Sequence, residues 1–176
     1  LTQDVARLHK DEAALAVYRE MAAKGPVVLG GDSAGGGLAL ALLAWICNEG
    51  LPQPLMTFVL SPWTDLTLSG DSMTANARSE VLLPPGRMSE ARDAYMGEAD
   101  PADPRASPLF ADFTGASAVH LWVGDTEILR DDARRMANHL RGQGVDATLI
   151  EESDLPHVWP LFPAWQLPET EATLDQ

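Results

Sequence analysis

The sequence has only one cysteine and few basic residues. A single cysteine cannot form a disulfide within the chain, and Cys47 lies inside an apolar stretch, so we expect a buried thiol that packs and does not react. Only 12 Lys and Arg residues stand against 26 Asp and Glu residues, which gives a formal net charge of −14. A chain this acidic repels a phosphate backbone, so we expect no nucleic-acid partner.

The sequence also lacks a long apolar run, an internal repeat, a low-complexity tract and a recognisable linker. No apolar stretch reaches the roughly 18 uncharged residues of a membrane-spanning helix, so we expect no membrane span. Apolar residues make up 45% of the 176 residues, enough for the core of one domain. The chain begins with Leu1 in place of methionine, so the absence of a signal peptide says little about compartment. Our expectation is a cytoplasmic protein of unspecified oligomeric state.

Short runs rich in valine and leucine alternate with stretches of helical periodicity along the chain. Strands are expected at residues 26–30, 55–60, 119–123 and 147–150. The first helix is expected to end at residues 24–25, with Asp11 as its cap. Further helices are expected at 35–47, 88–96 and 131–141, and the helix at 35–47 is expected to be buried on every side. The continuous apolar run at 55–60 predicts a strand covered on both faces, and the proline-rich residues 61–117 predict a long excursion from the sheet. This alternation predicts an α/β fold, a doubly wound, mostly parallel sheet with flanking helices that binds ligands at the carboxyl ends of its strands.

A burst of glycines surrounds one serine directly after the first expected strand. Residues 31–35 read Gly-Asp-Ser-Ala-Gly, which matches the Gly-x-Ser-x-Gly pattern of a nucleophile elbow. In such an elbow the serine sits on a strained turn between a strand and a helix, small neighbours let the two elements approach, and the hydroxyl is exposed. The pattern therefore predicts that Ser33 is a nucleophile.

Three other chemistries use similar glycines, and the sequence argues against each of them. A P-loop ends in Gly-Lys-Ser/Thr, whereas Gly37 is followed by Leu38. No frame of residues 30–40 supplies the Gly-x-Gly-x-x-Gly of a dinucleotide-binding loop. Trypsin-like proteases contain a similar string, but they are all-β and carry their histidine before the serine, where this chain has only His9.

A serine becomes nucleophilic when a neighbouring base takes its proton, so we expect a histidine at the end of another strand. His157 follows the fourth expected strand in a loop and is the candidate base. The other histidines fit structural positions better: His9 before or in the first helix, His120 inside a strand and His139 on the polar side of a helix.

The carboxylate that orients the histidine is expected after the third strand, where four acidic residues compete. Asp131 and Asp132 lie in the first turn of a helix, where acidic residues are common because they interact favourably with the helix dipole. Asp125 and Glu127 both lie at the end of the strand, and their spacing alone does not choose between them. The order serine, acid, histidine is the one that α/β-hydrolases use.

Several motifs in the right order resemble the hormone-sensitive-lipase-like carboxylesterases of the α/β-hydrolase fold over nearly the whole length. The matching strings are GDSAGG at 31–36, SPWTDL at 61–66, DPRASPLF at 103–110, VGDTEILRDDA at 123–133 and PHVWPLF at 156–162. The resemblance implies Ser33 as nucleophile, His157 as base and the backbone N–H of Ala34 as an oxyanion donor. It also implies Glu127 as the acid, with Asp125 as a supporting residue. The strings SPWTDL and DPRASPLF are expected to shape and brace the loops, not to take part in bond chemistry.

The family's His-Gly-Gly-Gly segment and its N-terminal cap have no counterpart in this sequence. The resemblance therefore implies that residues 1–176 are the C-terminal part of a catalytic domain, with the first strands, the oxyanion loop and the cap before Leu1 and with the last helix cut. The implied function is hydrolysis of small carboxylic esters with short to medium acyl chains through an acyl-enzyme, without metal or cofactor. Amide and carbamate bonds suit the same triad. Two alternatives remain: an inactive fragment, and a non-catalytic small-molecule binding protein on the same fold, since some members of this branch have lost the histidine.

Overall fold

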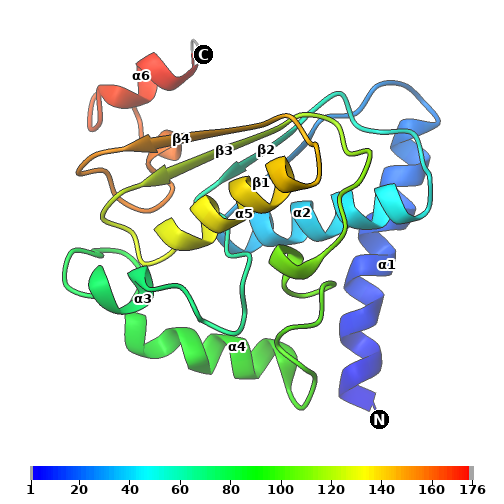
Figure 1. Ribbon diagram of the computed structural model, residues 1–176, viewed down its shortest axis with the longest axis horizontal. Coiled ribbons are helices and arrows are strands. Elements are labelled where there is room, and N and C mark those ends of the chain that lie inside the picture. The colour runs from blue at the N-terminus through cyan, green and yellow to red at the C-terminus, as the bar shows by residue number, and fades with distance from the viewer. Residues whose placement is uncertain (1, 175–176) are drawn as a thin grey trace.

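The centre of the molecule is a sheet of four parallel strands (Figure 1). This computed structural model describes residues 2–174, with side chains from residue 12 to residue 171. The strands lie in the order of the chain: β1 (Leu29–Asp32), β2 (Thr57–Leu60), β3 (Val119–Gly124) and β4 (Ala147–Glu152). Since all four strands run in the same direction, their carboxyl ends meet at one edge of the sheet, on the left in Figure 1.

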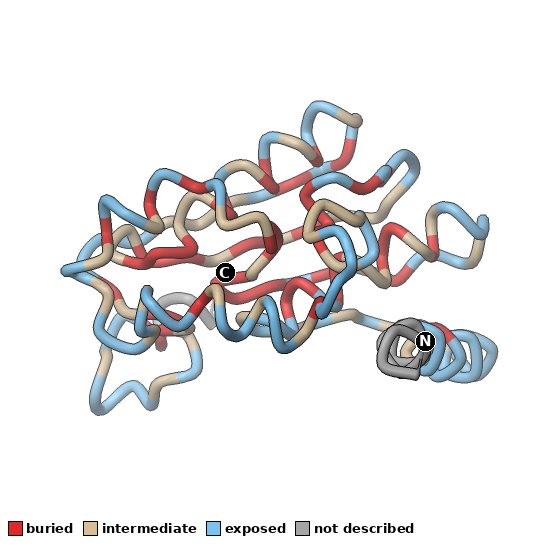
Figure 2. Tube along the Cα trace, turned by 90° about the horizontal axis from the view of Figure 1, so that it is seen from below, coloured by how far each residue is buried: buried red, intermediate tan, exposed pale blue. Residues whose placement is uncertain are grey.

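Two helices cover one face of the sheet. α2 (Ser33–Asn48) connects β1 to β2, and α5 (Arg130–Gly142) connects β3 to β4. Because each strand lies beside the one before it, right-handed crossovers put both helices on the same face. The core between the helices and the sheet contains the fully buried Leu40, Leu43, Val59, Leu121 and Met136. Figure 2 shows this arrangement, with buried residues gathered between the layers and exposed residues on the outer sides of the helices.

The opposite face of the sheet is more open. Gly30, Phe58, His120 and Thr148 form one row across the four strands, and none of them is buried. The prediction that the second strand is covered on both faces is therefore wrong for Phe58, which is 37% exposed. The parallel sheet and its flanking helices confirm the predicted α/β fold.

The remaining elements flank this core. α1 (Thr2–Ala22) packs against α2 through Leu15, Tyr18 and Ile46. The excursion between β2 and β3 contains α3 (Ser72–Ala75), η1 (Pro85–Arg87), α4 (Met88–Met96) and η2 (Pro108–Phe110). After β4 come η3 (Trp159–Leu161) and α6 (Glu169–Leu174). The excursion and the bounds of α4 agree with the sequence prediction, and none of the described helices is both long and apolar enough to cross a bilayer.

Several other boundaries differ from the sequence prediction. β1 begins at Leu29 and α2 begins at Ser33, because the elbow continues the strand directly into the helix. Asp11 lies inside α1 and not at its start, where the sequence prediction placed it. The helix expected to be buried on every side leaves Leu38 40% exposed. Cys47 on the same helix is half-buried, so the expectation of a buried thiol is also wrong.

Candidate active site

Ser33 stands between the end of β1 and the start of α2, as the elbow motif predicts. Its φ angle is 52°, in the left-handed region that residues with a side chain rarely adopt, so the backbone is strained at this position. A Cβ at Gly31 would overlap the carbonyl oxygen of Gly35, which explains the glycine before the serine. The Asp32 side chain does not cap α2, so it leaves the first N–H groups of the helix, including that of Ala34, uncapped. The helix N-terminus therefore presents partial positive charge beside the serine.

The loop after β2 packs against the elbow. The backbone N–H of Trp63 donates a hydrogen bond to the Ser33 carbonyl oxygen, with an N···O distance of 2.9 Å. This loop lies so close to α2 that a Cβ at Gly37 would overlap the Trp63 carbonyl oxygen. Gly37 therefore allows the helix to approach the loop.

Glu127 and His157 meet at the same edge of the sheet. Glu127 follows β3, His157 follows β4, and the distance between Glu127 Oε2 and His157 Nδ1 is 2.7 Å. The other carboxylate oxygen, Oε1, accepts hydrogen bonds from the backbone N–H of Gly124 at 2.6 Å and from the Ser61 hydroxyl at 2.7 Å. Glu127 is 1% exposed and His157 is 5% exposed. The carboxylate thus holds one ring nitrogen and leaves Nε2 for a second partner.

No hydrogen bond joins the Ser33 hydroxyl to the His157 ring, although both residues lie within the described part of the chain. Such contacts are often long in enzymes without a bound substrate and shorten when the reactants are in place. Ser33 is instead linked to the pair through the loop after β2, in which Trp63 contacts Ser33 and Ser61 contacts Glu127.

Asp125, the alternative acid, contacts a different part of the loop that carries the histidine. Its Oδ1 accepts the backbone N–H of Asp154 at 2.8 Å. Asp154 has a positive φ of 62°, so this hydrogen bond fixes a strained turn shortly before His157. Glu127 therefore contacts the ring of His157, whereas Asp125 supports the loop that carries His157.

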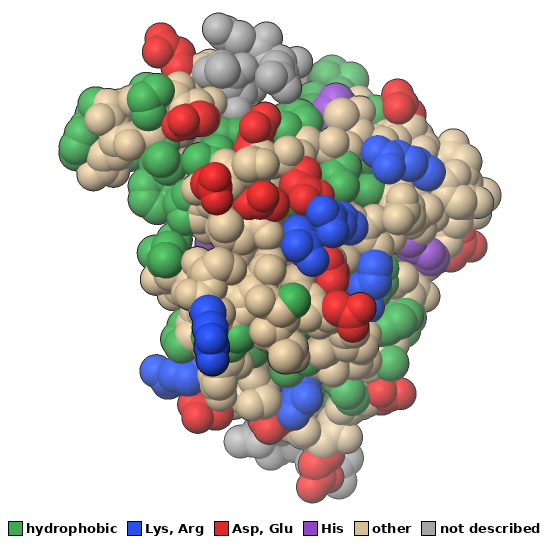
Figure 3. All heavy atoms as spheres, turned by 60° about the vertical axis from the view of Figure 1, so that its left-hand side comes forward, with side chains coloured by type: hydrophobic (Ala, Val, Ile, Leu, Met, Phe, Trp, Pro, Cys, Tyr) green, Lys and Arg blue, Asp and Glu red, His purple; other side chains and the backbone are tan. Residues whose placement is uncertain are grey.

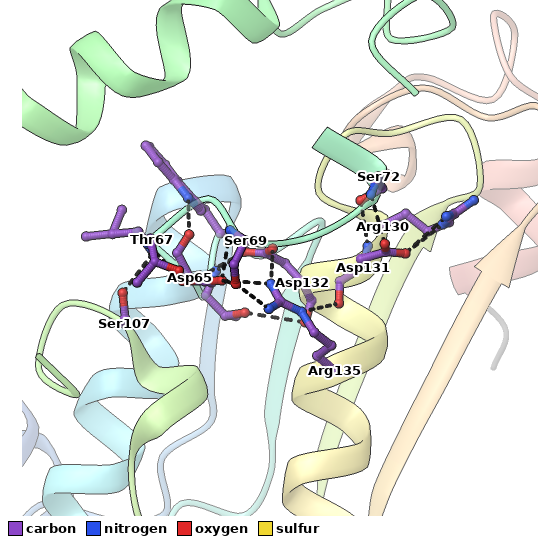
Figure 4. Close-up of polar contacts among 12 residues, drawn as sticks. Asp65, Thr67, Ser69, Ser72, Ser107, Arg130, Asp131, Asp132 and Arg135 are labelled. Atoms are coloured by element: carbon purple, nitrogen blue, oxygen red, sulfur yellow. Dashed lines mark hydrogen bonds and ion pairs between the residues drawn. The ribbon is translucent and has the colours of Figure 1, made fainter. Parts of the chain in front are cut away.

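The acidic residues in the first turn of α5 have contacts that go beyond the helix dipole. Asp132 is buried, and its Oδ2 accepts the backbone N–H groups of Thr64 and Asp65, both at 2.9 Å. Arg135 bridges the two aspartates, with Nη2 2.9 Å from Asp65 Oδ2 and 3.1 Å from Asp132 Oδ1 (Figure 4). This cluster, which we call the α5 brace (Asp65, Asp132 and Arg135), fixes the loop after β2 to α5.

The two carboxylates of the α5 brace differ in their affinity for a proton. Burial raises the pKa of Asp132 to about 6, against the opposing effects of the Thr64 N–H and the Arg135 charge. Burial also acts to raise the pKa of Asp65, but hydrogen bonds from Ser69, Thr67 and Arg135 outweigh it and hold this pKa below its ordinary value. Asp65 therefore stays ionised over a wider pH range than Asp132.

The DPRASPLF segment lies against the same loop, as expected of a brace. The buried Ser107 hydroxyl accepts the backbone N–H of Leu66 at 2.8 Å and donates to the Pro101 carbonyl oxygen at 2.6 Å. The backbone N–H of Leu109 donates to the Thr64 carbonyl oxygen at 3.1 Å. This segment therefore holds the loop after β2 at Thr64 and Leu66.

A cavity of about 540 Å³ borders the elbow. Its lining includes Ser33, Ala34, Trp63, Leu83 and Met88. A second cavity of about 420 Å³ shares Ala34 and Trp63 with the first. Most of these side chains are apolar, and the exposed ion pair of Arg87 and Glu90 lies at the first cavity. The serine thus borders an apolar space large enough for a small ligand.

The histidines other than His157 have structural contacts or lie outside the described side chains. His120 is in β3 and stacks on Trp122, with ring centroids 6.0 Å apart. His139 is in α5, and its Nε2 lies 2.7 Å from the Ala111 carbonyl oxygen. Both structural positions are confirmed, whereas His9 lies in the part of α1 whose side chains are not described.

Ser61 and Gly124 contact Glu127, and the sequence prediction named neither as a site residue. A Cβ at Gly124 would overlap the Leu155 carbonyl oxygen, so this glycine lets the loop of His157 approach the end of β3. The prediction gave the motif that begins with Ser61 only a role in loop shape. The position of Ser61 could have revealed its place in the site, because Ser61 is a polar residue directly after a parallel strand, as Ser33 is.

The surroundings of the site carry charges of both signs. Figure 3 turns the side on which the strands end toward the reader, and Asp and Glu side chains lie beside Lys and Arg side chains over the middle of this face. Among the described residues, no three His, Cys, Asp or Glu side chains form a group that could hold a metal ion.

Known proteins resemble this chain in sequence and in structure. A profile of the family described as the alpha/beta hydrolase fold matches residues 4–161. The chain is 37% identical over 152 residues to an acetyl-hydrolase of Streptomyces hygroscopicus, a match that covers 84% of this chain and 51% of that protein. It is 30% identical over 168 residues to an esterase of Acinetobacter venetianus, covering 93% and 55%. The crystal structure of an esterase from the bacterial hormone-sensitive lipase family superposes with a TM-score of 0.88 and 39% identity, covering 93% and 56%. The chain therefore spans about half the length of these relatives.

Proposed function

Because the chain belongs to the α/β-hydrolase family, in its hormone-sensitive-lipase-like branch, we propose that it carries the catalytic triad of a serine hydrolase that cleaves carboxylic esters. Ser33 is the nucleophile, His157 is the base, and Glu127 orients the ring of His157. The observation that carries this proposal is the 2.7 Å contact between Glu127 and His157 at the same sheet edge as the strained Ser33 elbow. The relatives named acetyl-hydrolase and esterase support the same class of reaction.

The reaction proceeds in two similar halves. His157, held by Glu127 through Nδ1, takes the Ser33 proton at Nε2 while the serine oxygen attacks the ester carbonyl carbon. The carbonyl oxygen becomes an oxyanion, which the N–H of Ala34 at the start of α2 stabilises. The alcohol leaves with the proton from His157, and water then repeats these steps on the acyl-enzyme, which releases the acid and restores Ser33.

The cavity beside Ser33 supports esters with a short to medium acyl chain. Its volume of about 540 Å³ lies within the usual range of small-molecule sites, and Trp63, Leu83 and Met88 give it an apolar lining. The kcat/KM values for p-nitrophenyl acetate, butyrate, octanoate and palmitate test this preference. We expect a maximum among the three shorter esters, and a maximum at palmitate contradicts the proposal.

Labelling with a fluorophosphonate tests the triad directly in the full-length protein that contains this chain. The wild type is expected to be labelled and to hydrolyse p-nitrophenyl acetate, and Ser33→Ala and His157→Gln are expected to lose both. The matched control is Ser153→Ala, which removes an exposed hydroxyl from the loop of His157 and should leave both properties unchanged. Ligand binding by an unlabelled, inactive wild type would instead indicate a non-catalytic binding protein.

We also propose that residues 1–176 form the later part of a larger catalytic domain. The proposal is supported by the length of the relatives, of which the chain covers about half. It is also supported by β1, an edge strand whose outer side has no partner strand among residues 2–174. In this arrangement further oxyanion donors and the cover of the acyl pocket come from outside residues 1–176.

A further inference from the structure

Ser61 connects the acid and the base of the proposed triad. It follows β2 directly and is fully buried. Its Oγ lies 2.7 Å from Glu127 Oε1 and 2.9 Å from the backbone nitrogen of Val158, the residue after His157. One hydroxyl therefore contacts both the carboxylate and the loop that carries the imidazole.

The direction of both hydrogen bonds follows from the chemistry of the partners. A backbone N–H can only donate, so Ser61 Oγ accepts the hydrogen bond from Val158. An ionised carboxylate can only accept, so the single Ser61 proton points at Glu127 Oε1. Together with the Gly124 N–H, this hydroxyl satisfies Oε1 and leaves Oε2 directed at His157 Nδ1.

The backbone at both ends of this link is strained. Ser61 has a φ of 47° and Val158 has a φ of 54°, and a β-branched residue rarely adopts the left-handed region. Strained residues persist where several contacts hold them, and the Val158 N–H bond to Ser61 is one such contact. The Ser61 N–H in turn donates to the Trp122 carbonyl oxygen at 2.7 Å, which ties Ser61 to the end of β3.

We propose that Ser61 is a positioning residue of the esterase site, a role that rests on the proposed function. Its hydroxyl orients the Glu127 carboxylate toward His157 and holds the loop of the base against the acid. Without this hydroxyl, Oε1 keeps only the Gly124 N–H, and Val158 loses the acceptor that fixes its strained backbone. The imidazole then spends less time in the orientation that accepts the Ser33 proton, so the chemical step slows while substrate binding is largely kept.

Two variants separate the effect of the Ser61 hydroxyl from the effect of its strained backbone. Ser61→Ala removes the hydroxyl and keeps a Cβ at a φ of 47°, whereas Ser61→Gly removes it in a residue that suits this φ. In the full-length protein both variants should lower kcat for p-nitrophenyl acetate by roughly 10- to 100-fold, as expected for a lost hydrogen bond to a charged group, with KM changed less than about twofold.

Ser107→Ala is the matched control. Ser107 is also fully buried, and its hydroxyl also donates one hydrogen bond and accepts one backbone N–H, but its partners are Pro101 and Leu66. We expect Ser107→Ala to lose a similar amount of stability and to keep the kcat of the wild type.

A spectroscopic measurement completes the test. The proton between His157 Nδ1 and Glu127 Oε2 should give a low-field ¹H NMR resonance, assigned by its loss in His157→Gln. We expect this resonance to move or broaden in both Ser61 variants and to stay in place in Ser107→Ala. Both kcat and this resonance report on the folded protein, so neither depends on a change in global stability.

The outcomes distinguish the two proposals. If Ser33→Ala keeps full activity, the proposed function fails. If Ser33→Ala is inactive but both Ser61 variants match Ser107→Ala in kcat and in the resonance, only the role of Ser61 is overturned. Wild-type activity in Ser61→Gly together with loss in Ser61→Ala also overturns it, because the backbone and not the hydroxyl would then matter.

Discussion

At the scale of single residues, the site depends on polar side chains that follow the carboxyl ends of parallel strands. Ser33 and Ser61 follow β1 and β2 directly, and Glu127 and His157 lie in the loops after β3 and β4. Glu127 is buried with both carboxylate oxygens bonded, which fixes its orientation toward His157. Asp125 belongs to the same turn and has the same charge, but it is bonded to the backbone of the loop. The two acids therefore differ in their partners: Glu127 contacts the ring of His157, and Asp125 contacts the backbone of Asp154.

The two acids are expected to differ sharply on substitution. Glu127→Gln should lower kcat about 10²- to 10⁴-fold, because an amide no longer stabilises the imidazolium and favours the wrong tautomer of His157. Asp125→Asn should change kcat by less than about tenfold and cost about 1 kcal/mol of stability through its bond to Asp154. Steady-state kinetics and urea unfolding of both variants measure these effects. A larger loss of kcat in Asp125→Asn would make Asp125 the acid.

At the scale of secondary-structure elements, the loop after β2 is held from several sides. It packs on α2 through the close approach at Gly37, it is tied to α5 by the α5 brace, and it is bonded to the segment before η2 through Ser107. The same loop contacts the carbonyl oxygen of Ser33 and the carboxylate of Glu127. Its attachment to α2 and α5 therefore keeps Ser33 and Glu127 in register, whereas the Ser107 bond holds the loop further along, at Leu66.

Two glycines of α2 should respond in opposite ways to substitution by alanine. Gly37→Ala places a Cβ against the Trp63 carbonyl oxygen and should destabilise the protein by about 1–3 kcal/mol through overpacking. A Cβ at Gly35 meets nothing within 4 Å, so Gly35→Ala should leave stability unchanged or raise it by up to about 1 kcal/mol through helix propensity. Urea unfolding of the two variants decides this, and equal effects would contradict the close approach.

The α5 brace should make stability depend on pH. The pKa of Asp132 is raised to about 6 by burial, so from about pH 4 to about pH 6 the folded state binds a proton that the unfolded state has lost. Stability therefore falls as the pH rises through this window. Relative to Asp132→Asn, the wild type should lose up to roughly 3 kcal/mol across it. Urea unfolding at several pH values measures the difference, which would be constant if Asp132 did not titrate there.

At the scale of the whole molecule, the sheet is covered unevenly. α2 and α5 cover one face, while the row of Gly30, Phe58, His120 and Thr148 on the other face contains no buried residue. β1 also lies at the edge of the sheet, next to Ser33, the proposed nucleophile. Exposed sheet edges and apolar faces favour association with other chains. These features agree with the proposal that residues 1–176 are part of a larger domain.

Residues 1–176 expressed alone are expected to behave differently from the full-length protein. The isolated polypeptide should self-associate in size-exclusion chromatography because of its open face and edge. It should also hydrolyse p-nitrophenyl acetate about 10²- to 10³-fold more slowly, the usual effect of losing one oxyanion donor. A monomeric polypeptide with the kcat of the full-length protein would contradict the proposal of a partial domain.

The sequence by itself determined the order of the elements and the position of the elbow. Both depend on local patterns: the alternation of apolar runs with helical periodicity, and small residues around Ser33 that allow one tight turn. It also indicated His157, because a loop after the last strand is the place for a base. Between Asp125 and Glu127 the residues alone did not choose, and the preference for Glu127 came from a family resemblance.

Only the tertiary structure decided which side chains touch. Glu127 meets Ser61 across a separation of 66 residues, and Ser61 meets Val158 across 97. The burial of Asp132 beneath the loop after β2 and the exposure of Phe58 on the sheet were equally absent from the local pattern. Such contacts depend on how distant strand ends are brought together by the packing of helices on the sheet, whereas turn chemistry and hydrophobic period act within a few neighbouring residues.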